Sequence, residues 1–213
     1  MADFSDRLAI FSNFVDTGIF EALRASTLRN LSGERVHIPA HKRGATIAYD
    51  GLRSHLPDVA RFYGSAALSR RIGEIVGEEV RPTLLRDQSS CSILIYDRDR
   101  DRIGWHYDHN FYNGRHFTAL LSLANECRGG TGLSSARLLV QRNDVAIEVP
   151  TPPNTLVLFE GAAVRHCVTA QGMGELRVML SMTFRTNPET TRIKDVQRRF
   201  KDIAYLGLRA LWS

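Results

Sequence analysis

Apolar residues recur at helical spacing in the part of the chain before about residue 90. Asp16 can cap a first helix, and a second helix is predicted from Asp58 to about Val76. Residues 33–57 between them are mixed and are interrupted by glycine and proline. We therefore expect residues 1–88 to form a helical support region.

Short runs of β-forming residues, separated by turn residues, follow from about residue 90 onward. Apolar runs of this length bounded by glycine, proline and asparagine are typical of strands. The predicted strands cover residues 92–96, 117–123, 136–140, 145–149, 155–159, 163–168 and 176–184. Seven short strands at close spacing favour a sandwich or a barrel, which we place at residues 89–186.

The last segment, residues 187–213, predicts an amphipathic helix with Asn187 as its cap and Pro188 in its first turn. Its apolar residues fall on one face and its basic residues fall mostly on the other. A solvated charged face explains this pattern, although a basic helix also suits nucleic acid or a membrane surface. The apolar face packs either on its own core or on a second copy, so a homodimer stays open.

Length and composition narrow the class of protein. A chain of 213 residues, 43% hydrophobic and 24% charged, predicts one soluble domain over residues 1–213. No apolar run approaches the ~18 residues that a membrane span needs, and no signal peptide is visible. The three cysteines have no disulfide-framework or zinc-site spacing, which fits a reducing compartment. We therefore expect a cytoplasmic protein without a membrane partner.

The net charge adds one further expectation. The chain has 28 lysines and arginines against 23 acidic residues, a formal charge of +5. A basic chain attracts anions, whether nucleic acid or small carboxylates and phosphates. The charge alone does not choose among these partners.

The segment Gly104-Trp-His-Tyr-Asp108 is the most informative motif. Residues i and i+2 of a strand point the same way, so His106 and Asp108 are predicted to lie side by side. His166, on a later β-like run, is the candidate third metal ligand. Two histidines and one carboxylate on one face of a metal ion leave coordination positions open, as in non-haem iron(II) oxygenases. A structural metal site would be closed by a fourth protein ligand.

Arg177 supplies the cation that a dicarboxylate cosubstrate needs. It lies on the run after His166, and its planar guanidinium suits a carboxylate because it can pair both oxygens at once. By strand alternation, Met179, Ser181 and Thr183 share its face. The predicted strand therefore presents a cation and two hydroxyls to the interior of the barrel.

These residues together resemble the signature of the iron(II)/2-oxoglutarate-dependent dioxygenases. That signature is His-x-Asp, a distant histidine, and an arginine or lysine about one strand later, which His106, Asp108, His166 and Arg177 match in order. The resemblance covers about ninety residues, from Tyr96 to Phe184.

A second segment supports the same resemblance. Pro153-Asn154-Thr155-Leu-Val-Leu-Phe159 is similar to the approach to the second histidine in prolyl-hydroxylase-like members, with Asn154 near the usual glycine. The family resemblance implies a mostly β fold with flanking helices. Its core would be a double-stranded β-helix, or jelly roll, with N-terminal helices and a C-terminal helix.

The resemblance also implies cofactors and roles. Fe(II) would be held by His106, Asp108 and His166, with 2-oxoglutarate and O₂ as cosubstrates, ascorbate as a reductant and Arg177 on the far carboxylate of 2-oxoglutarate. Thr118 and Ser122, which share a face of one predicted strand, either hydrogen-bond 2-oxoglutarate or only pack. Four further residues are candidates for the substrate site: Asn110, Tyr112, Ser181 and Thr183.

Within this superfamily, the motif is most similar to the small enzymes that act on free amino acids, among them hydroxylases and lysine-type halogenases. The halogenases replace the aspartate by glycine, whereas this chain keeps Asp108. The resemblance therefore implies hydroxylation of a C–H bond in a small amino-acid-like or amine-bearing substrate.

Three alternatives remain at this stage. Alkylation-repair oxygenases acting on nucleic acid carry paired arginines on one strand, and Arg177 and Arg185 are similar to that pair, although more widely spaced. A prolyl-hydroxylase-type enzyme would act on a peptide. Outside the enzymes, a cupin-like metal-binding module could share the fold, because fold does not fix function.

Overall fold

The computed structural model describes residues 4, 6–38, 41–83 and 87–187. The helix predicted over residues 187–213 lies outside these residues, apart from Asn187. Within the described part of the chain, no helix is both long enough and apolar enough to cross a membrane.

The described strands pair into one sheet of twelve strands, and neighbouring strands are antiparallel. The first six are β1 (Leu8–Phe11), β2 (Glu34–Ile38), β3 (Lys42–Ile47), β4 (Arg81–Pro82), β5 (Cys91–Tyr96) and β6 (Arg102–His106). The others are β7 (His116–Glu126), β8 (Leu138–Arg142), β9 (Val145–Val149), β10 (Leu156–Glu160), β11 (His166–Val168) and β12 (Leu176–Arg185).

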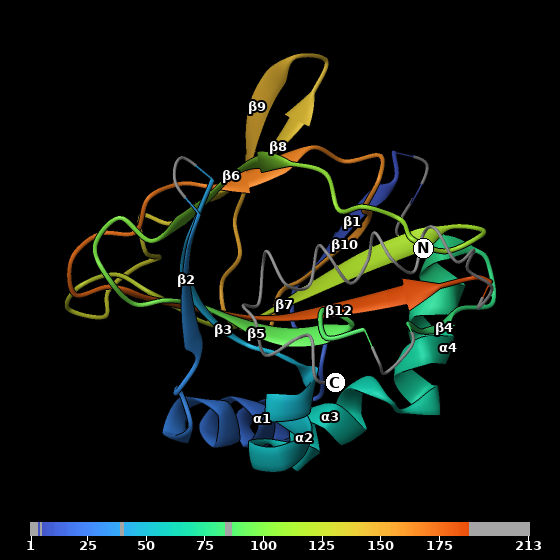
Figure 1. Ribbon diagram of the computed structural model, residues 1–213, viewed down its shortest axis with the longest axis horizontal. Helices are drawn as coiled ribbons and strands as arrows, with labels where there is room; N and C mark the ends of the chain where they lie inside the picture. Colours follow the sequence, from blue (N-terminus) through green and yellow to red (C-terminus); the bar gives the residue numbers. More distant parts are fainter. Residues whose placement is uncertain (1–3, 5, 39–40, 84–86, 188–213) are drawn as a thin grey trace.

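The strand order shows how the sheet closes on itself. Strands β1-β10-β7-β12-β5 form one half and β6-β11-β8-β9 form the other, with β3 hydrogen-bonded to both β5 and β6. Figure 1 shows the two halves as separate layers, with β6, β8 and β9 above β7, β12 and β5. This is the jelly-roll arrangement, and the predicted fold class is confirmed.

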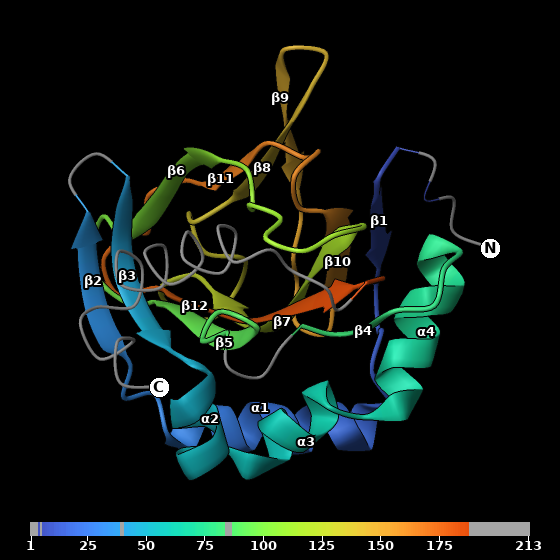
Figure 2. The same cartoon turned by 45° about the vertical axis from the view of Figure 1, so that its right-hand side comes forward.

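Four helices accompany the sheet in the described residues: α1 (Thr17–Arg29), α2 (Tyr49–His55), α3 (Pro57–Tyr63) and α4 (Ala66–Val76). Figure 2 shows α1, α2 and α3 below the layer of β5, β7 and β12, and α4 beside it. The Asp16 carboxylate caps α1 by accepting hydrogen bonds from the backbone N–H groups of Gly18 and Ile19, as predicted.

The helical reading of residues 1–88 was wrong in two respects. The single helix expected from Asp58 to Val76 is two helices, because the Ser65 hydroxyl accepts from the Leu68 N–H and caps a new helix. The region also contains β1, β2, β3 and β4. Strand β3 matters most, because it joins the two halves of the sheet.

Two clusters of buried residues lie on opposite sides of the larger half of the sheet. One cluster packs α1–α4 against it, and the other fills the space between the two halves. On β12, Val178, Leu180 and Met182 belong to the helix-side cluster, while Met179 belongs to the cluster inside the jelly roll. Successive residues of a strand face opposite sides, so the odd-numbered residues of β12 face inward.

Candidate metal centre and active-site cavity

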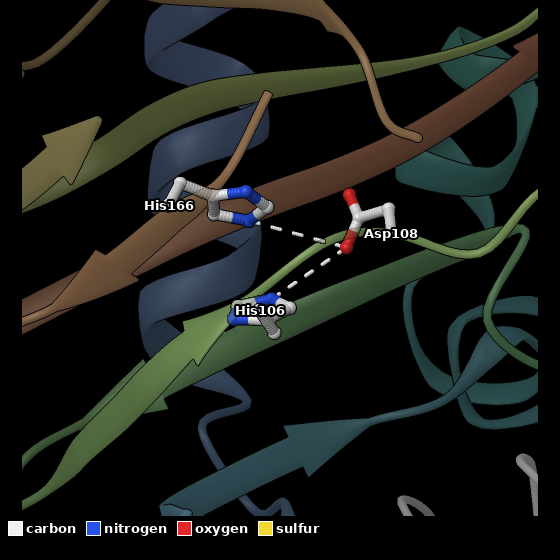
Figure 3. Close-up of side chains that lie close together, drawn as sticks. All are labelled: His106, Asp108 and His166. Carbon is white, nitrogen blue, oxygen red and sulfur yellow. Dashed lines mark ion pairs between the residues drawn. The ribbon is translucent and has the colours of Figure 1, made fainter. Parts of the chain in front are cut away.

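His106, Asp108 and His166 converge at one point of the jelly roll. His106 ends β6 and His166 begins β11, and the two residues are paired across these strands. Asp108 Oδ1 lies 3.6 Å from His106 Nε2 and 3.9 Å from His166 Nε2 (Figure 3). One ligand atom from each residue lies within 4.8 Å of the others. The motif therefore brings together the three side chains that the sequence predicted.

The route by which Asp108 reaches this point differs from the prediction. Strand β6 ends at His106, so Asp108 lies beyond the strand and not at a strand position. Its backbone N–H donates to the Gly161 carbonyl at 3.0 Å. A Cβ on Gly161 would come within 2.7 Å of the Asp108 Cβ, so glycine permits this close approach.

Hydrogen bonds fix the orientation of all three side chains. Thr118 Oγ1 donates to Asp108 Oδ2 at 2.6 Å, which leaves Oδ1 toward the histidines. His106 Nδ1 lies 2.8 Å from the Gly104 carbonyl, and His166 Nδ1 lies 3.1 Å from the Val164 carbonyl. A protonated Nδ1 donates to each carbonyl, so each Nε2 keeps its lone pair for a metal.

The protonation states suit metal ligation. Burial, reinforced by the neighbouring His166, lowers the pKa of His106 to about 4, so its imidazole is neutral at pH 7. Burial acts to raise the pKa of Asp108, but the two imidazoles and the Thr118 hydrogen bond hold that pKa below its ordinary value. Two imidazole nitrogens and one carboxylate oxygen are the donor set of a facial iron(II) site, so the residues fit this metal.

The three residues line a cavity of about 160 Å³ inside the jelly roll. Four other predicted residues also line it: Thr118, Tyr112, Ser181 and Thr183. Much of the remaining wall is apolar and includes Ile103, Leu94, Leu120, Leu138 and Val168. An apolar wall with a few converging polar groups is typical of a small-molecule site.

Three predicted residues lie outside the cavity lining: Asn110, Ser122 and Arg177. The Asn110 amide donates to the Gly114 carbonyl at 2.6 Å and its Oδ1 accepts from the Tyr112 N–H, so the side chain stabilises a turn. Ser122 is fully buried and its hydroxyl donates to the Thr151 carbonyl at 2.9 Å. The structure therefore gives the side chains of Asn110 and Ser122 partners within the protein and does not bring them to the cavity.

Arg177 is buried at the start of β12, with 1% of its surface exposed. Its Nη1 donates to Thr151 Oγ1 at 2.6 Å, its Nε is buried without a hydrogen-bond partner, and no ion pair joins it to any described residue. Burial lowers its pKa to about 10, so the side chain is charged at pH 7. Arg177 is not in the cavity lining, but its cross-strand neighbour Tyr96 is.

Several polar residues of the cavity wall were not predicted from the sequence. Strand β3 contributes Lys42 and Thr46, strand β5 contributes Ser92 and Tyr96, and Asp87 lies on the segment before β5. Burial lowers the pKa of Lys42 to about 8. None of these residues belongs to a spaced motif, and β3 itself was not predicted, so the sequence offered no signal for Lys42.

No protein-family model matches the sequence, and a search of curated proteins finds no match. Similar solved structures do exist. One is SnoN, an alpha-ketoglutarate-dependent epimerase of nogalamycin biosynthesis, at 13% identity and a TM-score of 0.66 over 89% of this chain and 82% of that chain. Another is a Pseudomonas putida prolyl-4-hydroxylase, at 15% identity and a TM-score of 0.59 over 86% and 94% of the two chains.

A third similar structure is HygX from Streptomyces hygroscopicus, solved with nickel and 2-oxoglutarate bound. It shares 12% identity with this chain at a TM-score of 0.61, over 85% of this chain and 84% of that chain. At these identities the likeness concerns the fold. The chain therefore shares its jelly-roll fold with these solved structures.

Proposed function

We propose that the protein is an Fe(II)/2-oxoglutarate-dependent oxygenase. The observation that carries this proposal is the convergence of His106, Asp108 and His166 on the wall of a cavity. Among the described residues, no histidine, cysteine or carboxylate joins them as a fourth ligand. These three residues would hold Fe(II) and leave its other positions toward the cavity. When bound, the metal and cosubstrate supply the oxidation: 2-oxoglutarate and O₂ yield succinate, CO₂ and one oxygen atom for a substrate C–H bond.

Arg177 would bind the far carboxylate of 2-oxoglutarate. This assignment is supported by the guanidinium, which is buried and forms no ion pair in the described part of the chain. A buried charge that nothing compensates is costly. The Thr151 hydroxyl fixes one of its nitrogens, and Tyr96 extends from the neighbouring strand to the cavity. A carboxylate between Arg177 and the metal would compensate the charge.

The other residues of the site orient groups and exclude water. The Thr118 hydroxyl and the Gly161 carbonyl hold Asp108, while the Gly104 and Val164 carbonyls hold the imidazoles. The apolar wall keeps bulk water away from the reacting C–H bond and so limits side reactions.

The reaction would be hydroxylation of a small, amino-acid-like substrate. The retained Asp108 completes the three-ligand set, and the cavity of about 160 Å³ suits a small molecule. Tyr112, Ser181 and Thr183 would contact that substrate, because they line the cavity with the metal ligands.

The alkylation-repair alternative gains no support from Arg185. This residue lies at the end of β12 opposite to Arg177, and its guanidinium lies over the ring of Tyr112, 5.3 Å from the ring centroid. The two arginines therefore do not form one anion-binding pair.

The proposal is tested by incubating the protein with Fe(II), 2-oxoglutarate, ascorbate and a metabolite extract. We expect succinate, together with a product 16 mass units heavier than a component of the extract. Asp108→Ala should abolish both, whereas Asp99→Ala, which changes a half-exposed carboxylate paired with Arg100, should abolish neither. The absence of succinate with the wild type, or equal succinate with Asp108→Ala, would contradict the proposal.

A further inference from the structure

Lys42 is a buried cation of the cavity wall that the proposed chemistry does not use. Only 7% of its surface is exposed, and its Nζ lies 3.2 Å from the Thr46 hydroxyl. Its side chain lines the same cavity as His106, Asp108 and His166. Its side chain therefore brings a positive charge to the cavity that contains the candidate metal centre.

The position of Lys42 is tied to the metal centre by strand pairing. Lys42 is paired with Ile103 of β6, the strand that ends at His106. The adjacent His41 accepts a hydrogen bond from the Gly104 N–H through its carbonyl, and its ring meets the His106 ring edge-on at 5.8 Å. The backbone that positions the first metal ligand therefore also holds the ammonium at the cavity.

The chemistry of the surrounding wall suits an oxyanion. A lysine ammonium is a compact point charge with three donors, and charged hydrogen bonds to a carboxylate or phosphate are strong in a buried site. The hydroxyl groups of Thr46, Ser92 and Ser181 also line the cavity and can donate to further oxygens of the same anion.

A count of oxyanions separates this role from cosubstrate binding. In the proposed function Arg177 binds the far carboxylate of 2-oxoglutarate, and the other carboxylate would bind the metal at its open positions. Lys42 lies on a different strand, β3, and lines the cavity in which the substrate would bind, so an anionic group of another molecule can meet it there.

Resting on the proposed function of the site, we propose that Lys42 binds an oxyanion of the primary substrate. The enzyme would thereby select small substrates with a free carboxylate or a phosphate over their neutral analogues. A free amino acid satisfies this requirement through its carboxylate and a phosphate monoester through its phosphate.

The test measures binding without turnover. Protein loaded with Ni(II) and 2-oxoglutarate is titrated with free amino acids, with the same amino acids as carboxamides, and with phosphate monoesters of small alcohols, followed by ligand-observed NMR. We expect at least one oxyanion to bind and its neutral analogue to bind roughly 10- to 100-fold more weakly. One charged hydrogen bond contributes a change in affinity of this size. The class that binds distinguishes a carboxylate from a phosphate.

Variants then assign the effect to Lys42. Lys42→Met should weaken binding of that oxyanion by a similar factor, and Lys42→Arg should recover part of the loss because it keeps the charge. Arg43→Met is the matched control, because Arg43 is the next residue, lies outside the cavity lining and instead contacts Asp101 at 3.7 Å. Binding of 2-oxoglutarate should change less than about twofold in all three variants, which also shows that they are folded.

Three results would overturn the inference. One is that no oxyanion probe binds the wild type, and another is that acids and amides bind equally. The third is that Lys42→Met weakens the binding of 2-oxoglutarate instead, which would show that Lys42 binds the cosubstrate. The proposed function fails separately, if the wild type binds no 2-oxoglutarate and forms no succinate.

Discussion

The two faces of β12 differ sharply, although they alternate along one strand. The residues that face the helices are apolar and fully buried: Val178, Leu180, Met182 and Phe184. The residues on the other face are mostly polar or charged: Arg177, Met179, Ser181, Thr183 and Arg185. The helix-side face thus contributes hydrophobic stabilisation, while the inward face offers groups for ligands. Substitutions on the two faces should therefore have separable effects on stability and on binding.

The largest effect on stability is expected on the helix-side face. Leu180→Ala removes a fully buried side chain from the core and should lower the free energy of unfolding by about 2–5 kcal/mol. Urea unfolding measures this loss. The affinity for Ni(II) at 25 °C should not change, because Leu180 faces away from the cavity. A weaker metal affinity in the folded variant would show that the two faces are coupled.

Substitution of Lys42 in the cavity wall should raise the free energy of unfolding, the opposite of Leu180→Ala, because a buried charge is costly. The pKa of Lys42 is about 8 in the folded protein against 10.5 for an ordinary lysine, so folding has to bury the charge. This cost is fully present below pH 8 and disappears as the pH rises through 10.5, and it amounts to about 3 kcal/mol at most. Lys42→Met should therefore be more stable than the wild type at pH 7.

Urea unfolding at several pH values checks this prediction. The stability advantage of Lys42→Met should shrink between pH 8 and pH 10.5, because the unfolded wild type binds more protons in this window than the folded protein. The other titratable groups of the cavity occur in both proteins and cancel in the difference: Asp87, Tyr96, Tyr107, Asp108, Tyr112, His106, His109, His116 and His166. A variant less stable than the wild type at pH 7 would contradict the account.

The next effect concerns the binding of 2-oxoglutarate by Arg177 at the start of β12. Arg177→Gln keeps a polar side chain but removes the charge, and should weaken 2-oxoglutarate binding roughly 10- to 100-fold. Calorimetric titration of the Ni(II)-loaded protein measures this affinity. Arg185→Gln on the same face is the matched control and should change it little, because Arg185 contacts Tyr112. An equal loss of 2-oxoglutarate affinity in both variants would contradict the assignment of Arg177 as the residue that binds the far carboxylate.

The smallest effect is expected for Thr118, which touches a metal ligand and not the metal. Thr118→Val preserves the shape of the side chain but removes the hydrogen bond to Asp108 Oδ2. Loss of such a partner should weaken metal binding by about tenfold. Competition with a coloured chelator measures the change, and an unaltered affinity would show that Gly161 alone positions the carboxylate.

The sequence predicted the parts of the site that depend on strand alternation and motif order. His106, Asp108 and His166 do meet, and Ser181 and Thr183 do line the cavity with them. Asn154, read as standing near a usual glycine, adopts a positive φ of 63°, the backbone region that glycine favours. The order of the motif residues, the alternation along one strand and the conformation of one turn are all properties of the sequence pattern, so the sequence contains them.

Features that depend on the tertiary structure were not predicted. Strand β3 has a short, weakly alternating sequence. It forms a strand because β2 pairs with one of its edges, while β5 and β6 pair with the two ends of its other edge. Lys42 could not be identified as a cavity residue until that strand was placed. Asn110 lies close to the motif in sequence, but its side chain turns away to bond Gly114.

Calorimetric titration of 2-oxoglutarate into the purified protein, with and without Ni(II), tests the central claim most directly. The account predicts that the wild type binds 2-oxoglutarate tightly only when the metal is present, and that Asp108→Ala loses this metal-dependent binding. Binding that is independent of metal, or that is equally strong in Asp108→Ala, would contradict the assignment of His106, Asp108 and His166 as the site where metal and cosubstrate meet.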